Sequence, residues 1–73
     1  MSPLFTQGAV CALAILNRNH DEPAMCAEVL IALGVTTEKD MRAAGVDEYD
    51  IEGIASAVQR AEQMRAARLR EGA

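Results

Sequence analysis

The chain has 73 residues, a net charge of −4 and an apolar fraction of 51%, to which fourteen alanines but only two aromatic residues contribute. This length allows one small domain, and a core rich in alanine gains little buried area per residue. We therefore expect a single domain over residues 1–73 that associates with itself. The negative charge disfavours nucleic-acid binding, because phosphates repel an acidic surface.

The longest unbroken apolar run covers residues 9–16 and is too short to span a bilayer. No basic residue precedes this run and no cleavage site follows it, so the sequence does not predict a signal peptide. We expect a cytoplasmic protein without a membrane contact.

The first predicted helix covers residues 3–18. Ser2 and Pro3 are typical of a helix start, with a capping hydroxyl followed by proline in the first turn. Between residues 9 and 16 every face of this helix is apolar, and such a helix must be covered on all sides. Because a small domain covers only part of it, we predict a symmetric homodimer through this helix. The expected dimer contacts are Val10, Leu13 and Ala14.

The second predicted helix covers residues 21–33, with Asp21 as its N-cap. In the resulting helical hairpin, Cys11 and Cys26 fall at similar depths, where they could touch. Their spacing matches neither a zinc site nor a redox CxxC pair, and their apolar surroundings favour inert, reduced thiols. We expect neither a metal ion nor a cofactor, and we expect both cysteines to be dispensable for function.

Two similar turns separate the remaining helices. Gly-Val-Thr-Thr at residues 34–37 and Gly-Val-Asp at residues 45–47 each place a glycine, which can close a helix, before an aliphatic residue that suits a Schellman-type stop. Thr37 and Asp47 are then placed to cap the next helix. These signals predict a short third helix over residues 37–44 and a fourth over residues 47–70.

The apolar stripe of the fourth helix consists of Ile51, Ile54, Ala55, Val58 and Ala61. Gly53 lies inside this helix and indicates close approach by another helix. The stripe fades after Ala61, and Arg65 stands where the next apolar residue would fall. We therefore expect residues 65–73 to form an exposed helix end. The predicted fold class is all-α, a small bundle of about four helices with tight Gly-Val turns.

The sequence gives no set of polar residues that could form a catalytic centre. His20 lies in a polar turn, without an orienting group or an oxyanion site nearby in sequence. The acidic residues at 47–52 lack the register of an EF-hand loop and suit the start of a helix better. We therefore do not expect an enzyme.

Two resemblances point to protein binding. The segment Asp-Met-Arg-Ala-Ala-Gly-Val at residues 40–46, followed by a long helix, resembles the end of SAM domains. That resemblance implies a helical bundle that works by protein–protein association. In its small size, high alanine content, single all-apolar helix and charged ends, the chain is also similar in type to small helical proteins that bacteriophages make. Those proteins disable host machinery such as CRISPR complexes, quorum-sensing regulators or pilus motors.

We therefore predict a non-enzymatic protein-binding module, an inhibitor or adaptor of a larger host protein. Its contact surface is expected in the charged second half of the chain, where the core no longer needs the apolar pattern. The predicted partner-binding residues are Glu38, Arg42, Tyr49, Arg65 and Arg68. Tyr49 is the strongest single candidate, because tyrosine is enriched at binding hot spots.

Two alternatives remain open at this point. Residues 30–36 resemble the turn of a helix-turn-helix motif, which would make residues 37–42 the recognition helix of a small DNA-binding regulator. The arginines near the C-terminus support this alternative, whereas Glu38 and Asp40 would face the phosphates. The other alternative is a structural subunit whose partner is a copy of itself.

Overall fold

The computed structural model describes residues 2–72, which form four α-helices and no strand. The all-α class and the order of the helices confirm the sequence prediction, and every helix boundary lies within two residues of the expected one. The helices are α1 (Pro3–His20), α2 (Pro23–Leu33), α3 (Glu38–Ala43) and α4 (Glu48–Glu71).

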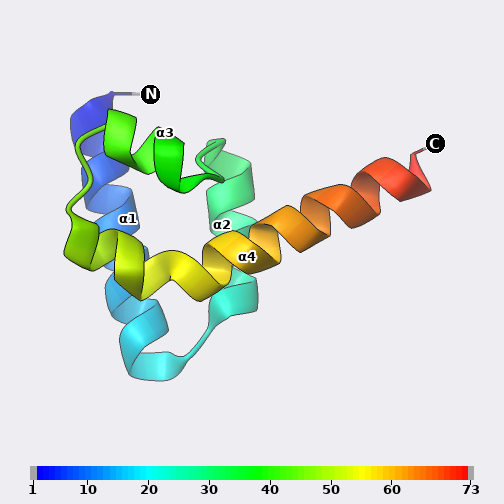
Figure 1. Cartoon of the computed structure of the whole chain (residues 1–73). Helices are drawn as coiled ribbons and strands as arrows, with labels where there is room; N and C mark the ends of the chain where they lie inside the picture. The colour runs from blue at the N-terminus through cyan, green and yellow to red at the C-terminus, as the bar shows by residue number, and fades with distance from the viewer. Residues whose placement is uncertain (1, 73) are drawn as a thin grey trace.

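Helix α4 is the central element of the fold. It packs against both α1 and α2, whereas α1 and α2 make few contacts with each other. Figure 1 shows α4 crossing the pair, with the short α3 closing one end between them. The second half of α4 continues past α2 and projects from the bundle (Figure 1). The molecule measures 36 × 27 × 15 Å. Helix α4 has 24 residues, and a helix of that length accounts for the longest dimension.

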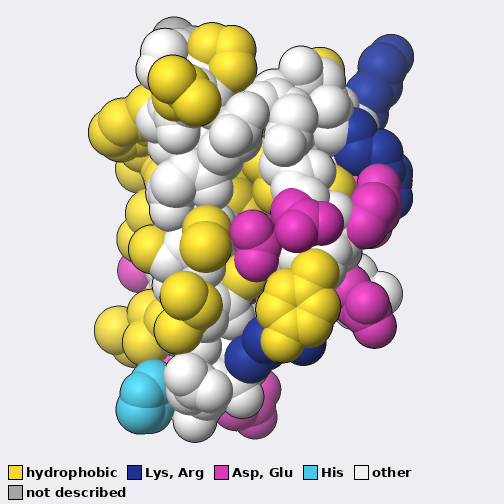
Figure 2. Space-filling view, turned by 90° about the vertical axis from the view of Figure 1, so that its left-hand side faces the viewer, with side chains coloured by type: hydrophobic (Ala, Val, Ile, Leu, Met, Phe, Trp, Pro, Cys, Tyr) yellow, Lys and Arg dark blue, Asp and Glu magenta, His cyan; other side chains and the backbone are white. Residues whose placement is uncertain are grey.

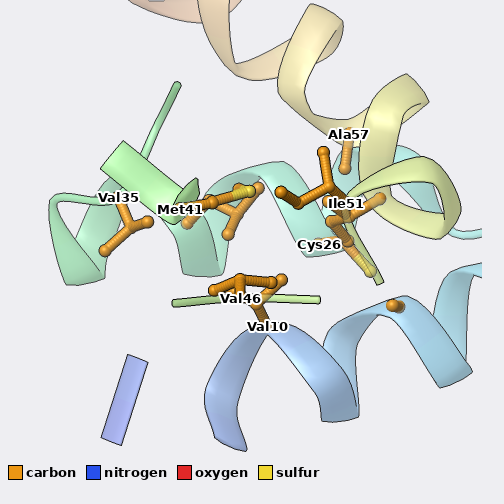
Figure 3. Packing of buried hydrophobic residues seen from close by; sticks show 10 residues of the cluster. Val10, Cys26, Val35, Met41, Val46, Ile51 and Ala57 are labelled. Carbon is orange, nitrogen blue, oxygen red and sulfur yellow. The ribbon is translucent and has the colours of Figure 1, made fainter. Parts of the chain in front are cut away.

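The core is small and is built from all four helices and both Gly-Val turns (Figure 3). Its largest fully buried side chains include Leu30 from α2, Met41 from α3 and Ile54 from α4. Met41 packs in the core and holds α3 against the bundle, although this helix has only six residues. Alanines occupy several of the remaining core positions and let the helix backbones approach closely. The buried apolar residues are Val10, Ala14, Cys26, Ala27, Leu30, Val35, Met41, Val46, Ile51, Ile54, Ala57 and Ala61.

The structure places the predicted dimer contacts of the first helix in or against the protomer's own core. Val10 and Ala14 are each only 1% exposed and lie inside the protomer's own core, with Leu13 packed partly buried against it. The apolar run at residues 9–16 gave no indication of which face of α1 the rest of the chain covers. The long α4 packs on the face that carries Val10 and Ala14, whereas Leu13 stays partly exposed.

Both Gly-Val turns have the predicted Schellman geometry. Gly34 and Gly45 adopt φ angles of 75° and 84°. The amide of Val35 donates to the carbonyl of Leu30, and the amide of Val46 donates to that of Met41, each at 3.0 Å. Both valines are buried, which is the hydrophobic contact that this motif requires.

The caps that follow the turns are also as predicted. The hydroxyl of Thr37 accepts a hydrogen bond from the amide of Asp40 at 3.0 Å, and the carboxylate of Asp47 accepts one from the amide of Tyr49 at 3.4 Å. Each cap satisfies an amide that the first turn of a helix leaves without a partner.

The predicted role of Asp21 is wrong. Asp21 does not cap α2; it ends α1 in a left-handed conformation (φ 49°), and its amide donates to the carbonyl of Asn17. Aspartate is one of the few residues besides glycine that adopt this conformation readily. Helix α2 begins two residues later at Pro23, without a side-chain cap, and the proline leaves one amide fewer to satisfy in the first turn.

Within residues 2–72, no helix combines the length and the apolar character that crossing a membrane requires.

Candidate functional site

The residues that could serve as metal ligands or nucleophiles are dispersed or buried in the part of the chain that the structure describes. In this part of the chain no three His, Cys, Asp or Glu side chains lie close enough to share a metal ion. The thiol of Cys26 is buried and donates to the carbonyl of Leu13 at 3.6 Å. Burial, and then the nearby charge of Glu22, raise the pKa of Cys26 above its ordinary value. A thiol that stays protonated is a poor nucleophile and a poor metal ligand.

The five predicted partner-binding residues lie in three places. Tyr49 is at the beginning of α4, beside the end of α1. Glu38 and Arg42 are on α3. Arg65 and Arg68 are on the projecting part of α4, residues 62–71, which we call the arm.

Arg42 links α3 to the first turn of α4. Its Nε atom donates to Glu48 at 2.6 Å, and its guanidinium also donates to Glu38 at 3.1 Å. The hydrogen bond from Arg42 lowers the pKa of Glu48 below its ordinary value. All three side chains are largely exposed, so the ion pairs contribute little stability. They do occupy the Arg42 guanidinium within the chain, which leaves it less available to a partner.

Tyr49 is 62% exposed, and its ring is covered on one side by Arg18 of α1. The guanidinium carbon of Arg18 lies 3.8 Å from the ring centroid, and the same group donates to the Tyr49 carbonyl. Arg18 reaches this position across Gly53, where an added Cβ atom would clash with the arginine Nε. The close approach that the sequence indicated at Gly53 is therefore made by an arginine side chain.

A first groove runs between α4 and the α2–α3 connection. It has a volume of about 340 Å³ and is open to solvent. In it, Arg65 donates to the hydroxyl of Thr36 at 2.9 Å, so the arginine side chain is held across the groove. The groove brings the predicted residues Glu38 and Arg65 together. Its lining residues are Thr36, Thr37, Glu38, Val58, Glu62 and Arg65.

A second groove, of about 290 Å³, lies between the end of α2 and the arm. It is lined by Ile31, Arg65, Arg68 and Leu69, and we call it the arm groove. Leu69 is 74% exposed although it is a large apolar side chain. The sequence prediction included both arginines but missed Ile31 and Leu69. An apolar residue among arginines beyond the end of the core stripe was the one signal that could have indicated Leu69.

No protein-family model, curated protein or solved structure matches this chain. The arm groove places two guanidinium groups beside two apolar side chains, and these groups determine what it can bind.

The geometry of α3 does not favour the DNA-binding alternative. A recognition helix lies in the major groove and contacts several base edges. Helix α3 has six residues, carries Glu38 and Asp40 in its first turn, and holds its one arginine in ion pairs. A DNA phosphate approaching this helix would meet carboxylates first.

Proposed function

We propose that this protein is a non-enzymatic protein-binding module, an inhibitor or adaptor that holds a segment of a larger protein in the arm groove. The observation that carries the proposal is the composition of the arm. Among residues 2–72, the buried positions of α4 end at Ala61, yet the helix continues for ten residues and presents Arg65, Arg68 and Leu69 together. These side chains are not needed by the core.

The chemistry of the groove suits an acidic segment with one large apolar side chain. The guanidinium groups of Arg65 and Arg68 can donate two parallel hydrogen bonds to a carboxylate. Ile31 and Leu69 offer an apolar surface beside them. A groove this shallow and open accommodates one or two side chains of a linear segment, whereas small-molecule sites enclose most of their ligand.

The resemblance in type to bacteriophage inhibitors would make the larger protein a component of host machinery. That part of the proposal is supported by the small size and the alanine-rich composition of the chain.

Selection from a displayed library of random linear peptides tests the proposal and does not require the target to be identified first. We expect the selected peptides to combine Asp or Glu with Leu, Ile or Phe. Their binding should weaken with added salt, because exposed charges are screened. The double variant Arg65→Glu/Arg68→Glu should lose binding while keeping its helical circular dichroism spectrum.

Arg60→Glu is the matched control, because Arg60 is an exposed arginine of α4 that lines neither groove. It should bind the selected peptides like the unaltered protein. Selection of peptides without acidic residues, or equal loss of binding in Arg60→Glu, would contradict the proposal.

A further inference from the structure

The outer face of α1, which points away from α4, is apolar and uncovered within the protomer. Leu4, Gly8, Cys11 and Ile15 follow one another at spacings of four, three and four residues, which places them along one line of a helix. Leu4 is 79% exposed and Ile15 is 54% exposed. Figure 2 views the molecule from one side and shows apolar side chains along its left edge, down to the histidine. We call this line, with its neighbours Phe5 and Ala12, the outer seam.

The size of the side chains along the outer seam varies in a regular way. The middle holds the small residues Gly8, Cys11 and Ala12, whereas the two ends hold large ones, Leu4 and Phe5 at one end and Ile15 at the other. A second helix can therefore approach closely at the middle while the large side chains pack on either side. The profile is nearly symmetric about residue 10, so it is complementary to itself when one copy is turned end to end.

Gly8 has no role inside the protomer. Glycine weakens a helix interior relative to alanine. A Cβ atom at Gly8 would meet nothing within 4 Å, so the protomer's packing does not require glycine there. Close approach of a helix from outside the protomer would require it. This observation is independent of the exposure of the large side chains.

The charge distribution favours a second copy over a different partner. Residues 2–17 contain no charged side chain, so two copies of the seam meet without repulsion. The same lack of charge gives the seam no ionic group with which to select a charged protein. Met25 and Val29 of α2 are also exposed and lie opposite that helix's buried residues.

We propose that two copies of this chain associate through their outer seams as an antiparallel, two-fold symmetric dimer. The two-fold axis crosses α1 near residue 10, and Leu4 and Phe5 of each copy pack against Ile15 of the other. This interface uses the opposite face of α1 from Val10 and Ala14, and it leaves the arm groove free. The proposal does not depend on the function of that groove.

Sedimentation equilibrium over a range from low to high micromolar concentration tests the association. We expect a reversible monomer–dimer equilibrium for the unaltered protein. Gly8→Leu should weaken the dimer by at least about tenfold while keeping the fold, because the added side chain meets only open space in the protomer. Ile15→Glu should act in the same way. Gln59→Glu, an equal charge change at an exposed position of α4, should leave the equilibrium unchanged.

Cysteine cross-linking tests the orientation. Cys11 is partly exposed and lies near the expected axis, whereas Cys26 is buried, so a short bifunctional maleimide should join the Cys11 thiols of two copies. Cys11→Ser should abolish this product. In the Cys11→Ser background, a mixture of the Leu4→Cys and Ile15→Cys variants should cross-link to each other and not to themselves. A monomer at every concentration, self-linking of Leu4→Cys, or an undiminished dimer in Gly8→Leu would overturn the proposal.

Discussion

Two adjacent residues at the end of α1 attach this helix to one turn of α4 in different ways. Asn17 is buried, and its amide donates to the carbonyl of Gly53 and the hydroxyl of Ser56, each at 2.9 Å. Arg18 is exposed and lies over Gly53 and the ring of Tyr49. Because the buried amide cannot exchange its partners for water, the hydrogen bonds of Asn17 matter more for stability than the exposed contacts of Arg18.

The steric relation between Gly53 and Arg18 predicts that the effect of Gly53→Ala on stability depends on Arg18. In an Arg18→Ala background, Gly53→Ala should raise the free energy of unfolding by up to about 1 kcal/mol, because alanine favours a helix interior over glycine. With Arg18 present, the new methyl group displaces the guanidinium from Tyr49 and cancels most of that gain. A double-mutant cycle from urea denaturation measures the difference. Additive effects of the two substitutions would show that Arg18 does not lie over Gly53 in solution.

The sequence predicted close approach of another helix at Gly53, whereas the atoms nearest to it belong to the side chain of Arg18. A glycine inside an amphipathic helix is a local signal, readable from the residues around it. That an arginine more than thirty positions earlier fills the space depends on where α1 crosses α4. The pairing of Arg18 with Tyr49 has the same origin, so Tyr49 was predicted as an exposed aromatic without its partner.

At the scale of the elements, the two Gly-Val turns were the most predictable part of the molecule. Each turn is specified within a few residues, by a glycine that adopts positive φ, a valine that packs back and a side-chain cap. The predictions that failed concern features that depend on the packing of whole helices. Asp21 could start α2 or end α1, and the positions of the two helices decide between these roles. The buried face of α1 is likewise decided by α4.

The two glycine turns should differ in their tolerance of alanine. Gly34→Ala should lower the free energy of unfolding by about 1–2 kcal/mol, the cost of left-handed backbone in a residue with a Cβ atom. Gly45→Ala should cost more, because its Cβ would also lie 2.8 Å from the side-chain nitrogen of Gln7, which donates to the carbonyl of Ala44. Urea denaturation of both variants measures the two costs.

Gln7→Ala is the control for that comparison. In this background the clash is absent, so Gly45→Ala and Gly34→Ala should then cost similar amounts. An unchanged difference between the two turns would contradict the assigned contact between Gln7 and the α3–α4 turn.

At the scale of the whole molecule, the bundle and the arm have separate tasks. Removing residues 65–73 should change the free energy of unfolding by less than about 1 kcal/mol, in the range of surface substitutions, because the buried core residues of the described chain precede this segment. The same truncation should abolish binding of acidic peptides, because it removes both arginines of the arm groove. Urea denaturation and peptide titration on one preparation test both parts. A truncated chain that unfolds would show that the arm supports the bundle.

Only part of the arm groove could be predicted from the sequence. The arginines were predicted because they interrupt an apolar stripe. Ile31 was not, because only the crossing of α2 and α4 brings it beside Leu69, nearly forty positions away.

The order of the helices along the chain has a consequence for biosynthesis. Helix α4, which holds α1 and α2 together, is the last of the four helices to leave the ribosome, and the first two helices have little contact of their own. Short helices without a packing partner are marginal in water. We therefore expect no stable intermediate while α1, α2 and α3 emerge, and we expect cooperative folding only after most of α4 has been synthesised. A ribosome that stalls before residue 47 would hold a chain with its apolar faces exposed, a substrate for chaperones and proteases.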